Sequence, residues 1–388
     1  MDLAKPCVMY HFERIPAWAT GGAMQIREGL RSLETHNVTV EYLQTPERPA
    51  AWIKYNILLS NAWYLLFCVT RVCRYADVLA IDYGGRLHTL LFALVIRLMG
   101  RIHLAIFVQS LNFAYRPSRL RNLLDKQVSR VFLRLGDIVI TSGQAVSMEV
   151  AQLGVCRERI RTIYPALRDE FRRCFSPVEA RNGHEGLIVL WVGRVHPIKG
   201  LEYLIEAMAS LKTGLDVRLV LVGDESLVPS YTQRIVELIK KTGLQQQVDR
   251  RGRIDCVDAL ATIYSKADIF VLPSVWDTSP IAVIEAMSFG LPIITTTAGG
   301  AGEWVEDGVN GFLVPPADVG GLRNAIGRLI RERNLRERMG RASLGRSVGY
   351  CDRTWKDVGR EYYETFLPLL KQQTGPITLP ASPNQLSR

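Results

Sequence analysis

The chain has 388 residues, of which 48% are hydrophobic and 22% are charged, and its net charge is +10 at pH 7. This length and composition are typical of a folded protein with two ordinary domains and argue against intrinsic disorder. The seven cysteines form no Cys-x-x-Cys pair, which argues against a zinc site or a disulfide framework and favours a reducing, cytoplasmic compartment. The six histidines show no metal spacing and no Asp-x-Asp is present, so we expect neither a bound metal nor another cofactor.

Residues 1–10 indicate a first strand rather than a signal peptide. The longest uncharged run, residues 55–70, contains polar residues and falls short of the roughly 20 apolar residues of a spanning helix. We therefore expect no transmembrane segment.

Apolar runs typical of strands alternate along the chain with helical patterns, which predicts parallel α/β units. In the first half we expect strands at 7–11, 38–43, 78–81, 103–108 and 138–142, with helices at 21–34 and 87–99. In the second half we expect strands at 187–192, 217–222, 248–252, 269–272 and 292–296, separated by helices.

The two halves predict two Rossmann-like, doubly wound domains, 1–171 and 187–350, whose ligand-binding loops face each other across a cleft. Residues 172–186, rich in charge, Gly, Asn and Pro, are the expected linker. The amphipathic segment 351–371 is expected to be helical, and the polar residues 372–388 to form a mobile tail.

The positive charge is concentrated in the first half, where residues 1–170 carry a net +7 and residues 171–388 only +3. Much of it lies beside the Trp- and Leu-rich stretch 52–67, in Arg116, Arg119, Arg121, Lys126, Arg130 and Arg134. Two readings are open: a solvated helix face with one buried helix, or a peripheral contact with an anionic membrane surface on its inner, cytoplasmic side. Since no recognisable nucleic-acid motif accompanies the charge, we expect no nucleic-acid partner.

Candidate ligand loops follow several of these strands. After the first strand, Gly21 and Gly22 precede a helix, where they permit close approach of a ligand and the helix N-terminus favours an anion. Ordinary turn chemistry is the alternative reading. After the strand 187–192, Gly193 leads into a loop with Arg194 and Lys199, whose charges can converge on a diphosphate leaving group. Surface cations in a loop are the alternative here.

Two weaker motifs end the next strands. Gly223 permits close backbone approach and is followed by Asp224, for which an acid at a helix N-terminus is the alternative reading. Arg253 and Ile254 are candidates to line a pocket for a nucleotide base.

The sharpest motif begins where a strand leads into a helix expected at 281–289. Ser279 is a favourable N-cap and Pro280 suits the first helical position. The free N–H groups of Ile281 and Ala282 should therefore point outward as an anion site.

Two carboxylates, Asp277 and Glu285, bracket that helix N-terminus. Because Ile281 and Glu285 share one helix face, the carboxylate of Glu285 should lie one turn below the amides, within reach of a ribose diol. The alternatives are that Glu285 pairs with a nearby cation or caps a neighbouring loop, and that Asp277 is a turn residue at the helix entry. An anion site between two carboxylates matches a sugar nucleotide, so the motif predicts a donor-binding site.

Taken in order, these motifs resemble those of the retaining glycosyltransferases of family 4, within the glycosyl transferases group 1. The resemblance spans most of the chain and rests on Gly21-Gly22, Gly193-Arg194 through Lys199-Gly200, Val222-Gly223-Asp224, Pro273-Ser274 through Glu285-Ala286-Met287, Gly290-Leu291-Pro292, Gly299-Gly300, Glu303 and Asn310-Gly311-Phe312. It implies the two-domain GT-B fold, with the acceptor side in 1–171, the donor side in 187–350, and the helix 351–371 returning to the first domain.

The resemblance also implies roles for single residues. Arg194 and Lys199 would bind the donor diphosphate, Glu285 the ribose and Asp277 the sugar, while residues 279–282 would present backbone amides. No protein nucleophile is implied, because the leaving diphosphate itself assists the acceptor hydroxyl on the same face and the anomeric configuration is retained.

Two positions depart from the family pattern. Asp277 stands where the family usually has Glu, and Ser279-Pro280 replaces Phe-Gly or Ser-Gly. Gln109 stands where the family often has a histidine that contacts the sugar; it can donate and accept hydrogen bonds but cannot titrate near neutral pH.

The sequence hypothesis is therefore a metal-independent, retaining hexosyltransferase that uses a nucleotide-diphosphate sugar, with UDP favoured. Its acceptor would be a hydroxyl of a cell-envelope, lipid-linked or small-molecule compound. The alternatives are a nucleotide-sugar epimerase, a phosphorylase of the same fold, for which no cofactor-lysine motif is evident, and a donor-binding scaffold that has lost catalysis.

Overall fold

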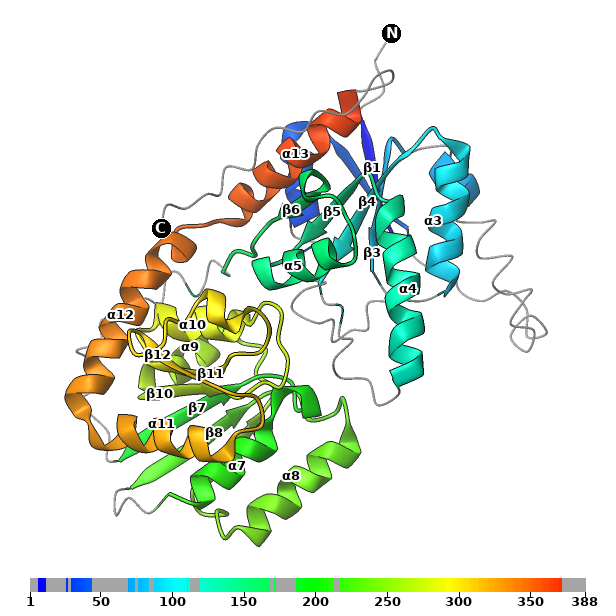
Figure 1. Cartoon of the computed structure of the whole chain (residues 1–388). Coiled ribbons are helices and arrows are strands. Elements are labelled where there is room, and N and C mark those ends of the chain that lie inside the picture. Colours follow the sequence, from blue (N-terminus) through cyan, green and yellow to red (C-terminus); the bar gives the residue numbers. More distant parts are fainter. Residues whose placement is uncertain are drawn as a thin grey trace. The chain divides into compact units, whose positions relative to one another are not determined.

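The computed structural model describes residues 6–11, 26, 29–43, 69–73, 76–83, 87–109, 111, 119–167, 171, 186–211 and 216–371. They form two compact units: Met1–Pro165 with Trp355–Arg388, and Ala166–Thr354. Each unit contains one six-stranded parallel sheet covered by helices (Figure 1). The prediction of an α/β protein with two Rossmann-like domains is confirmed.

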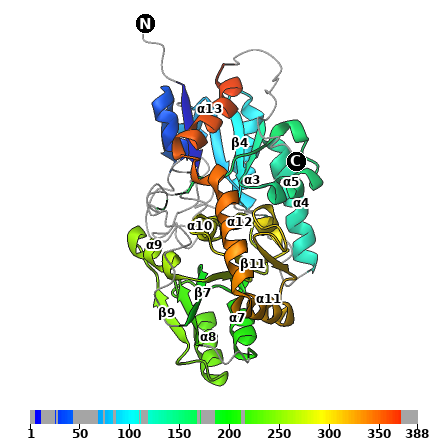
Figure 2. The same ribbon diagram turned by 90° about the vertical axis from the view of Figure 1, so that its left-hand side faces the viewer.

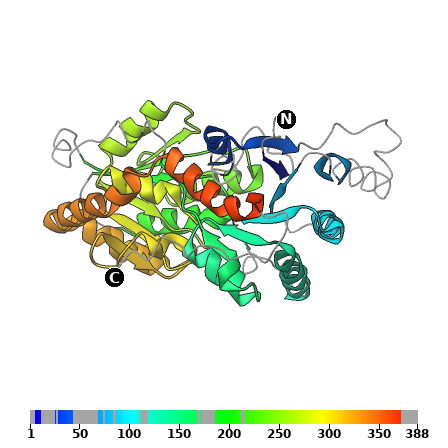
Figure 3. The same ribbon diagram turned by 90° about the horizontal axis from the view of Figure 1, so that it is seen from above.

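The first unit contains a sheet of order β2-β1-β3-β4-β5-β6. Its strands are β1 (Cys7–His11), β2 (Thr39–Leu43), β3 (Val78–Asp82), β4 (His103–Val108), β5 (Ile138–Thr141) and β6 (Ile160–Thr162). Its helices are η1 (Ser32–His36), α3 (Leu87–Met99), α4 (Arg119–Leu135), α5 (Gln144–Gln152), η4 (Arg157–Arg159) and α13 (Trp355–Lys371). Helices α3 and α4 cover one face, and α13 lies over the other, where it contacts η1 and β3 (Figures 1 and 3).

The second unit contains a sheet of order β12-β11-β10-β7-β8-β9. Its strands are β7 (Leu187–Val192), β8 (Val217–Val222), β9 (Val248–Gly252), β10 (Ile269–Leu272), β11 (Ile293–Thr296) and β12 (Gly311–Val314). Its helices are η6 (Pro197–Lys199), α7 (Leu201–Ala209), α8 (Pro229–Lys241), α9 (Val257–Lys266), α10 (Ile281–Ser288), η7 (Gly299–Glu303), α11 (Val319–Arg331) and α12 (Arg333–Cys351). Figure 2 shows α7, α8 and α11 on one side of the sheet and α9 and α10 on the other.

This strand order places the reversal of chain direction across the second sheet between β7 and β10. Ligands of doubly wound sheets bind outside the carboxyl ends of the strands at that switch point, because the loops on either side of it diverge there. A ligand site is therefore expected at the loops after β7 and β10.

An aspartate at the start of three strands fixes the neighbouring strand in place. Asp77 accepts a hydrogen bond from the backbone N–H of Cys7 at 2.7 Å, Asp137 from that of Leu104 at 2.8 Å and Asp268 from that of Ile188 at 2.8 Å. Each aspartate follows a small residue and precedes a buried aliphatic strand, so both sheets use the same device to pair a backbone N–H near the start of an interior strand.

Some elements differ from the prediction. The helix expected at 21–34 is helical at residue 26 and from 29 to 31 and then tightens into η1, while Gly21 and Gly22 lie outside the described residues. The short strands β6 and β12 were not predicted.

The division between the units falls after Pro165 and after Thr354 rather than at the expected residues 171 and 350. Phe171 lies in the second unit because its buried ring packs edge-on against Tyr264 and Phe289. The expected linker, except Gly186, and the expected tail lie outside the described residues. None of the helices that the structure describes is long and apolar enough to span a membrane.

Candidate active site

The loops after β7, β8 and β10 are joined by backbone hydrogen bonds. The N–H of Val275 donates to the carbonyl of Ile198 at 2.8 Å, and the N–H of Val195 donates to the carbonyl of Asp224 at 3.0 Å. The candidate site at the switch point is therefore built on a hydrogen-bonded backbone frame.

Lys199 and Asp277, which are 78 positions apart in the chain, form an ion pair across the switch point. The exposed fractions of their side chains are only 14% and 11%, so the pair is largely shielded from water. The structure thus brings together Lys199 and Asp277, two of the four residues, with Arg194 and Gln109, that were expected at the diphosphate and the sugar.

The third of these residues, Arg194, is half-buried in the same loop as Lys199. It has no ion-pair or hydrogen-bond partner among the described residues, which leaves its guanidinium available to an anion. The nearby His196 accepts a hydrogen bond at Nδ1 from the N–H of Ile198 at 3.2 Å. Burial lowers the pKa of His196, and the charges of Arg194 and Lys199 lower it further. The loop therefore holds two cations around an imidazole that favours its neutral form.

The N-terminus of α10 differs from the prediction. Pro280, with φ −76° and ψ 85°, occupies the N-cap position, so Ser279 is not the N-cap and Pro280 is not the first helical residue. The N–H of Ile281 donates to the carbonyl of Ser279 at 3.0 Å. The prediction of a free Ile281 amide is therefore wrong, because the turn before the helix closes on itself; Ala282 lies in the first helical turn.

Three buried polar atoms in the loop from β10 to α10 have no hydrogen-bond partner within the part of the chain that the structure describes. They are the hydroxyls of Ser274 and Ser279 and the indole N–H of Trp276. A buried unpaired donor costs roughly 1–3 kcal/mol, so such atoms are rare unless a ligand or water pairs with them. Ser274 and Trp276 were not predicted, because only the folded loop reveals that their polar atoms are buried.

Glu285 on the second turn of α10 is 6% exposed. Its Oε2 accepts a hydrogen bond from the hydroxyl of Tyr264 on α9 at 2.9 Å. Helical periodicity places Tyr264 on the buried face of α9 with Leu260 and Ala261, but its contact with Glu285 is a tertiary feature that the sequence did not reveal.

The loops after β8 and β9 flank this site. A Cβ on Gly223 would lie 1.6 Å from the carbonyl oxygen of Gly193, so only glycine fits the close approach of these two loops. Asp224 accepts hydrogen bonds from the N–H and Oγ of Ser226 at 2.8 and 2.6 Å, which lower its pKa. Since α8 begins five residues later, at Pro229, the alternative reading of Asp224 as a helix N-terminal acid is wrong.

The two residues suggested for a base pocket lie just beyond β9. The side chain of Arg253 is 48% exposed and pairs with Asp255 at 2.6 Å and with Asp224 at 3.9 Å. Ile254 is partly buried.

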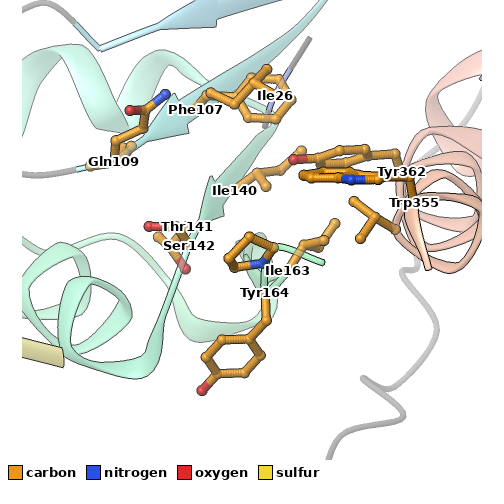
Figure 4. Close-up of a pocket in the computed structure, with 13 residues that line it drawn as sticks. Ile26, Phe107, Gln109, Ile140, Thr141, Ser142, Ile163, Tyr164, Trp355 and Tyr362 are labelled. Atoms are coloured by element: carbon orange, nitrogen blue, oxygen red, sulfur yellow. The ribbon is translucent and has the colours of Figure 1, made fainter. Parts of the chain in front are cut away.

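Gln109 follows β4 in the first unit and lines a pocket within that unit (Figure 4). Its Nε2 is buried and has no hydrogen-bond partner among the described residues. The pocket also contains Thr141 and Ser142 near Gln109 and the rings of Trp355 and Tyr362 from α13, and its lining includes no charged side chain.

Among the described residues, no group of three or more His, Cys, Asp or Glu side chains is arranged to hold a metal ion.

Comparisons with known proteins match part of the chain to a family and nearly the whole chain to a fold. Residues 176–345, less than half of the chain, match the family Glycosyl transferases group 1. An alpha-D-kanosaminyltransferase of Streptomyces kanamyceticus is 34% identical over 153 residues, which are 39% of this chain and 38% of that protein. The chain spans 38% to 58% of the length of the first four curated relatives that it matches.

Solved structures match over nearly the whole chain. The sucrose-phosphate synthase of Thermosynechococcus elongatus has a TM-score of 0.77 at 21% identity, covering 94% of this chain and 99% of that one. Anabaena HepE, solved in complex with UDP-glucose, has a TM-score of 0.70 at 20% identity, covering 93% and 99%. Residues 176–345 thus match glycosyl transferases group 1, and the two parallel sheets are those of the GT-B glycosyltransferase fold.

Proposed function

We propose that the protein is a retaining hexosyltransferase of family 4. It moves a hexose-type sugar from a nucleotide-diphosphate sugar, with UDP favoured, to an acceptor hydroxyl, without a metal ion or another cofactor. The product would be a cell-envelope glycan, a lipid-linked glycan or a small-molecule glycoside. The UDP-glucose complex of the HepE neighbour supports this choice of donor.

The convergence of charged and unpaired polar groups at the switch point carries the proposal. Arg194 lacks a partner among the described residues, Lys199 is held by a carboxylate that a ligand can replace, and Ser274, Trp276 and Ser279 leave buried polar atoms unpaired. Cations for a diphosphate beside donors and acceptors for hydroxyls are what a sugar nucleotide requires.

The proposed chemistry needs no protein nucleophile. The bond between the sugar C1 and the diphosphate oxygen breaks as the acceptor oxygen bonds to C1 on the same face, and the acceptor proton passes to a diphosphate oxygen. Arg194 and Lys199 stabilise the negative charge that develops on the leaving diphosphate. Asp277 binds a sugar hydroxyl, and Glu285 binds the ribose. Gln109 would contact the sugar.

Donor screening followed by a transfer assay tests the proposal. We expect one class among UDP-, GDP- and ADP-sugars to raise the melting temperature, because a ligand of the native state stabilises it by mass action. Transfer should persist in EDTA, and NMR of the product should show retained anomeric configuration. Glu285→Gln should weaken donor binding, whereas Glu306→Gln, whose side chain is 55% exposed, serves as the matched control.

Other outcomes would contradict these assignments. Unchanged donor affinity and turnover in Glu285→Gln would refute the role of Glu285. An epimerised sugar nucleotide formed without any acceptor would indicate an epimerase. Tight donor binding without transfer to any acceptor of a broad panel would indicate a scaffold.

We further propose a peripheral contact with an anionic membrane through α3 and α4. Both helices expose large apolar side chains, with Leu98 86% exposed. The others are Leu91, Met99, Leu123, Leu124 and Val131, and exposed basic residues on or beside the same helices are Arg97, Arg101, Lys126 and Arg134. Arg116 and residues 52–67 lie outside the described residues, as do the side chains of Arg119 and Arg121.

Flotation with vesicles tests the membrane contact. We expect the protein to float with anionic vesicles and not with neutral phosphatidylcholine vesicles, because basic residues near a negative surface contribute roughly 1 kcal/mol each. The variant Leu98→Glu with Lys126→Glu and Arg134→Glu should remain in the soluble fraction. Flotation unaffected by this variant would rule out the α3–α4 face.

A further inference from the structure

The carboxylate of Glu285 is held by a buried hydroxyl, that of Tyr264. The hydroxyl donates to Oε2 at 2.9 Å, and the exposed fractions of Tyr264 and Glu285 are 0% and 6%. A hydrogen bond to an ionised acceptor is stronger than one between neutral groups, and exclusion of water increases its effect. The orientation of this carboxylate therefore depends on where Tyr264 places its oxygen.

Ring packing fixes the position of Tyr264 independently of that hydrogen bond. Its ring stacks on Phe289 with centroids 5.5 Å apart and planes at 10°, and Phe171 packs edge-on at 5.8 Å. The three rings come from α9, from the residue after α10 and from the chain before β7. Since offset aromatic pairs are stabilising in themselves, the phenol would keep its place without Glu285.

We propose that Tyr264 is a positioning residue that orients the Glu285 carboxylate toward the two ribose hydroxyls of the nucleotide. The inference rests on the proposed function, in which Glu285 binds the ribose. A carboxylate offers two acceptor oxygens, so the bond from Tyr264 to Oε2 is compatible with a vicinal diol. Loss of the hydroxyl removes this hold on the carboxylate, and the ribose contact should weaken while the diphosphate contacts of Arg194 and Lys199 stay intact.

The test compares a nucleotide with its form lacking both ribose hydroxyls. UDP, GDP and ADP are first titrated into the full chain by calorimetry, and the one that binds is compared with its 2′,3′-dideoxy analogue. We expect Tyr264→Phe, which keeps the ring, to bind the ribonucleotide roughly tenfold more weakly than the wild type. The dideoxy analogue should bind the variant and the wild type equally. Both ligands are titrated into the same preparation of each protein, so the ratio of their affinities does not depend on the fraction of that protein that is folded.

Ser288→Ala is the matched control. Its Oγ donates to the backbone carbonyl of Glu285 at 2.7 Å, so the substitution removes a buried hydrogen bond on the same residue without touching the carboxylate. We expect it to keep the wild-type preference for the ribonucleotide. The positioning role is overturned if Tyr264→Phe keeps that preference while Glu285→Gln loses it. If Glu285→Gln keeps it too, or if the wild type binds none of the three nucleotides, the proposed function fails and the positioning role fails with it.

Discussion

Gly299 and Gly308 offer a matched pair for testing how the loop that carries Asp277 is held. Their φ angles are +74° and +76°. A Cβ on Gly299 would lie 2.0 Å from the carbonyl oxygen of Asp277, whereas nothing lies within 4 Å of a Cβ on Gly308. The neighbouring Gly300 N–H donates to that same Asp277 carbonyl at 2.7 Å, so the backbone there has little freedom to move away.

Alanine substitutions at these two glycines should therefore separate two contributions to the loss of folding stability. Both Gly299→Ala and Gly308→Ala place a side chain in the left-handed region, which costs about 1–2 kcal/mol. Only Gly299→Ala adds a clash with backbone, and overpacking of this kind costs about 1–3 kcal/mol more. The second cost is also expected to displace Asp277 and to weaken binding of the sugar nucleotide.

Urea denaturation and calorimetry measure the two effects. We expect a lower unfolding midpoint for Gly299→Ala than for Gly308→Ala, and weakened donor binding in Gly299→Ala alone. Equal midpoints and equal donor affinities for the two variants would show that the contact between Gly299 and Asp277 does not hold the loop.

Three further predictions concern the buried charges. Lys199→Met leaves the Asp277 carboxylate largely buried without its cation. The urea midpoint of this variant should therefore fall below that of the double variant Lys199→Met with Asp277→Leu. The reverse order would contradict a coupled pair. Because the pKa of His196 is lowered by burial and then by neighbouring cations, the unfolded chain binds more protons, and stability should fall as pH drops below 6.5. His196→Asn should weaken this dependence of stability on pH, as measured by unfolding curves. An unchanged dependence would exclude His196 as its cause. Burial raises the pKa of Asp137, but hydrogen bonds from His103 and Leu104 and the charge of Arg97 outweigh burial and lower the pKa. The stabilisation from Asp137 is therefore present above pH 3.8 and lost at lower pH. The same acid transition in Asp137→Asn as in the wild type would contradict this.

The fold could be predicted because it depends on local patterns. Buried parallel strands are continuous apolar runs, and these set the bounds of β1, β4, β7 and β8 to the residue. No residue of β6 is fully buried and β12 buries only its first and last residues, so neither strand shows such a pattern.

The candidate site could be predicted only in part. Lys199 and Asp277 were recognisable because each follows a strand of the switch point, where the topology brings the loops together. The closed turn at Ile281 depends on the backbone angles of Pro280, which suits a first helical position equally well by composition. Tyr264 was missed because a tyrosine on the buried face of a helix gives no sign of which acceptor its hydroxyl reaches.

The ion pair between Lys199 and Asp277 has to open if a sugar nucleotide binds to both residues. On the proposed function, an intact sugar nucleotide gives both residues a new partner at once, since the diphosphate pairs with the Lys199 ammonium and a sugar hydroxyl donates a hydrogen bond to the Asp277 carboxylate. The nucleoside diphosphate left after transfer offers nothing to Asp277, and re-formation of the pair then competes with it for Lys199. Asp277 would thereby compete with the nucleoside diphosphate for Lys199, which favours release of that product over its retention.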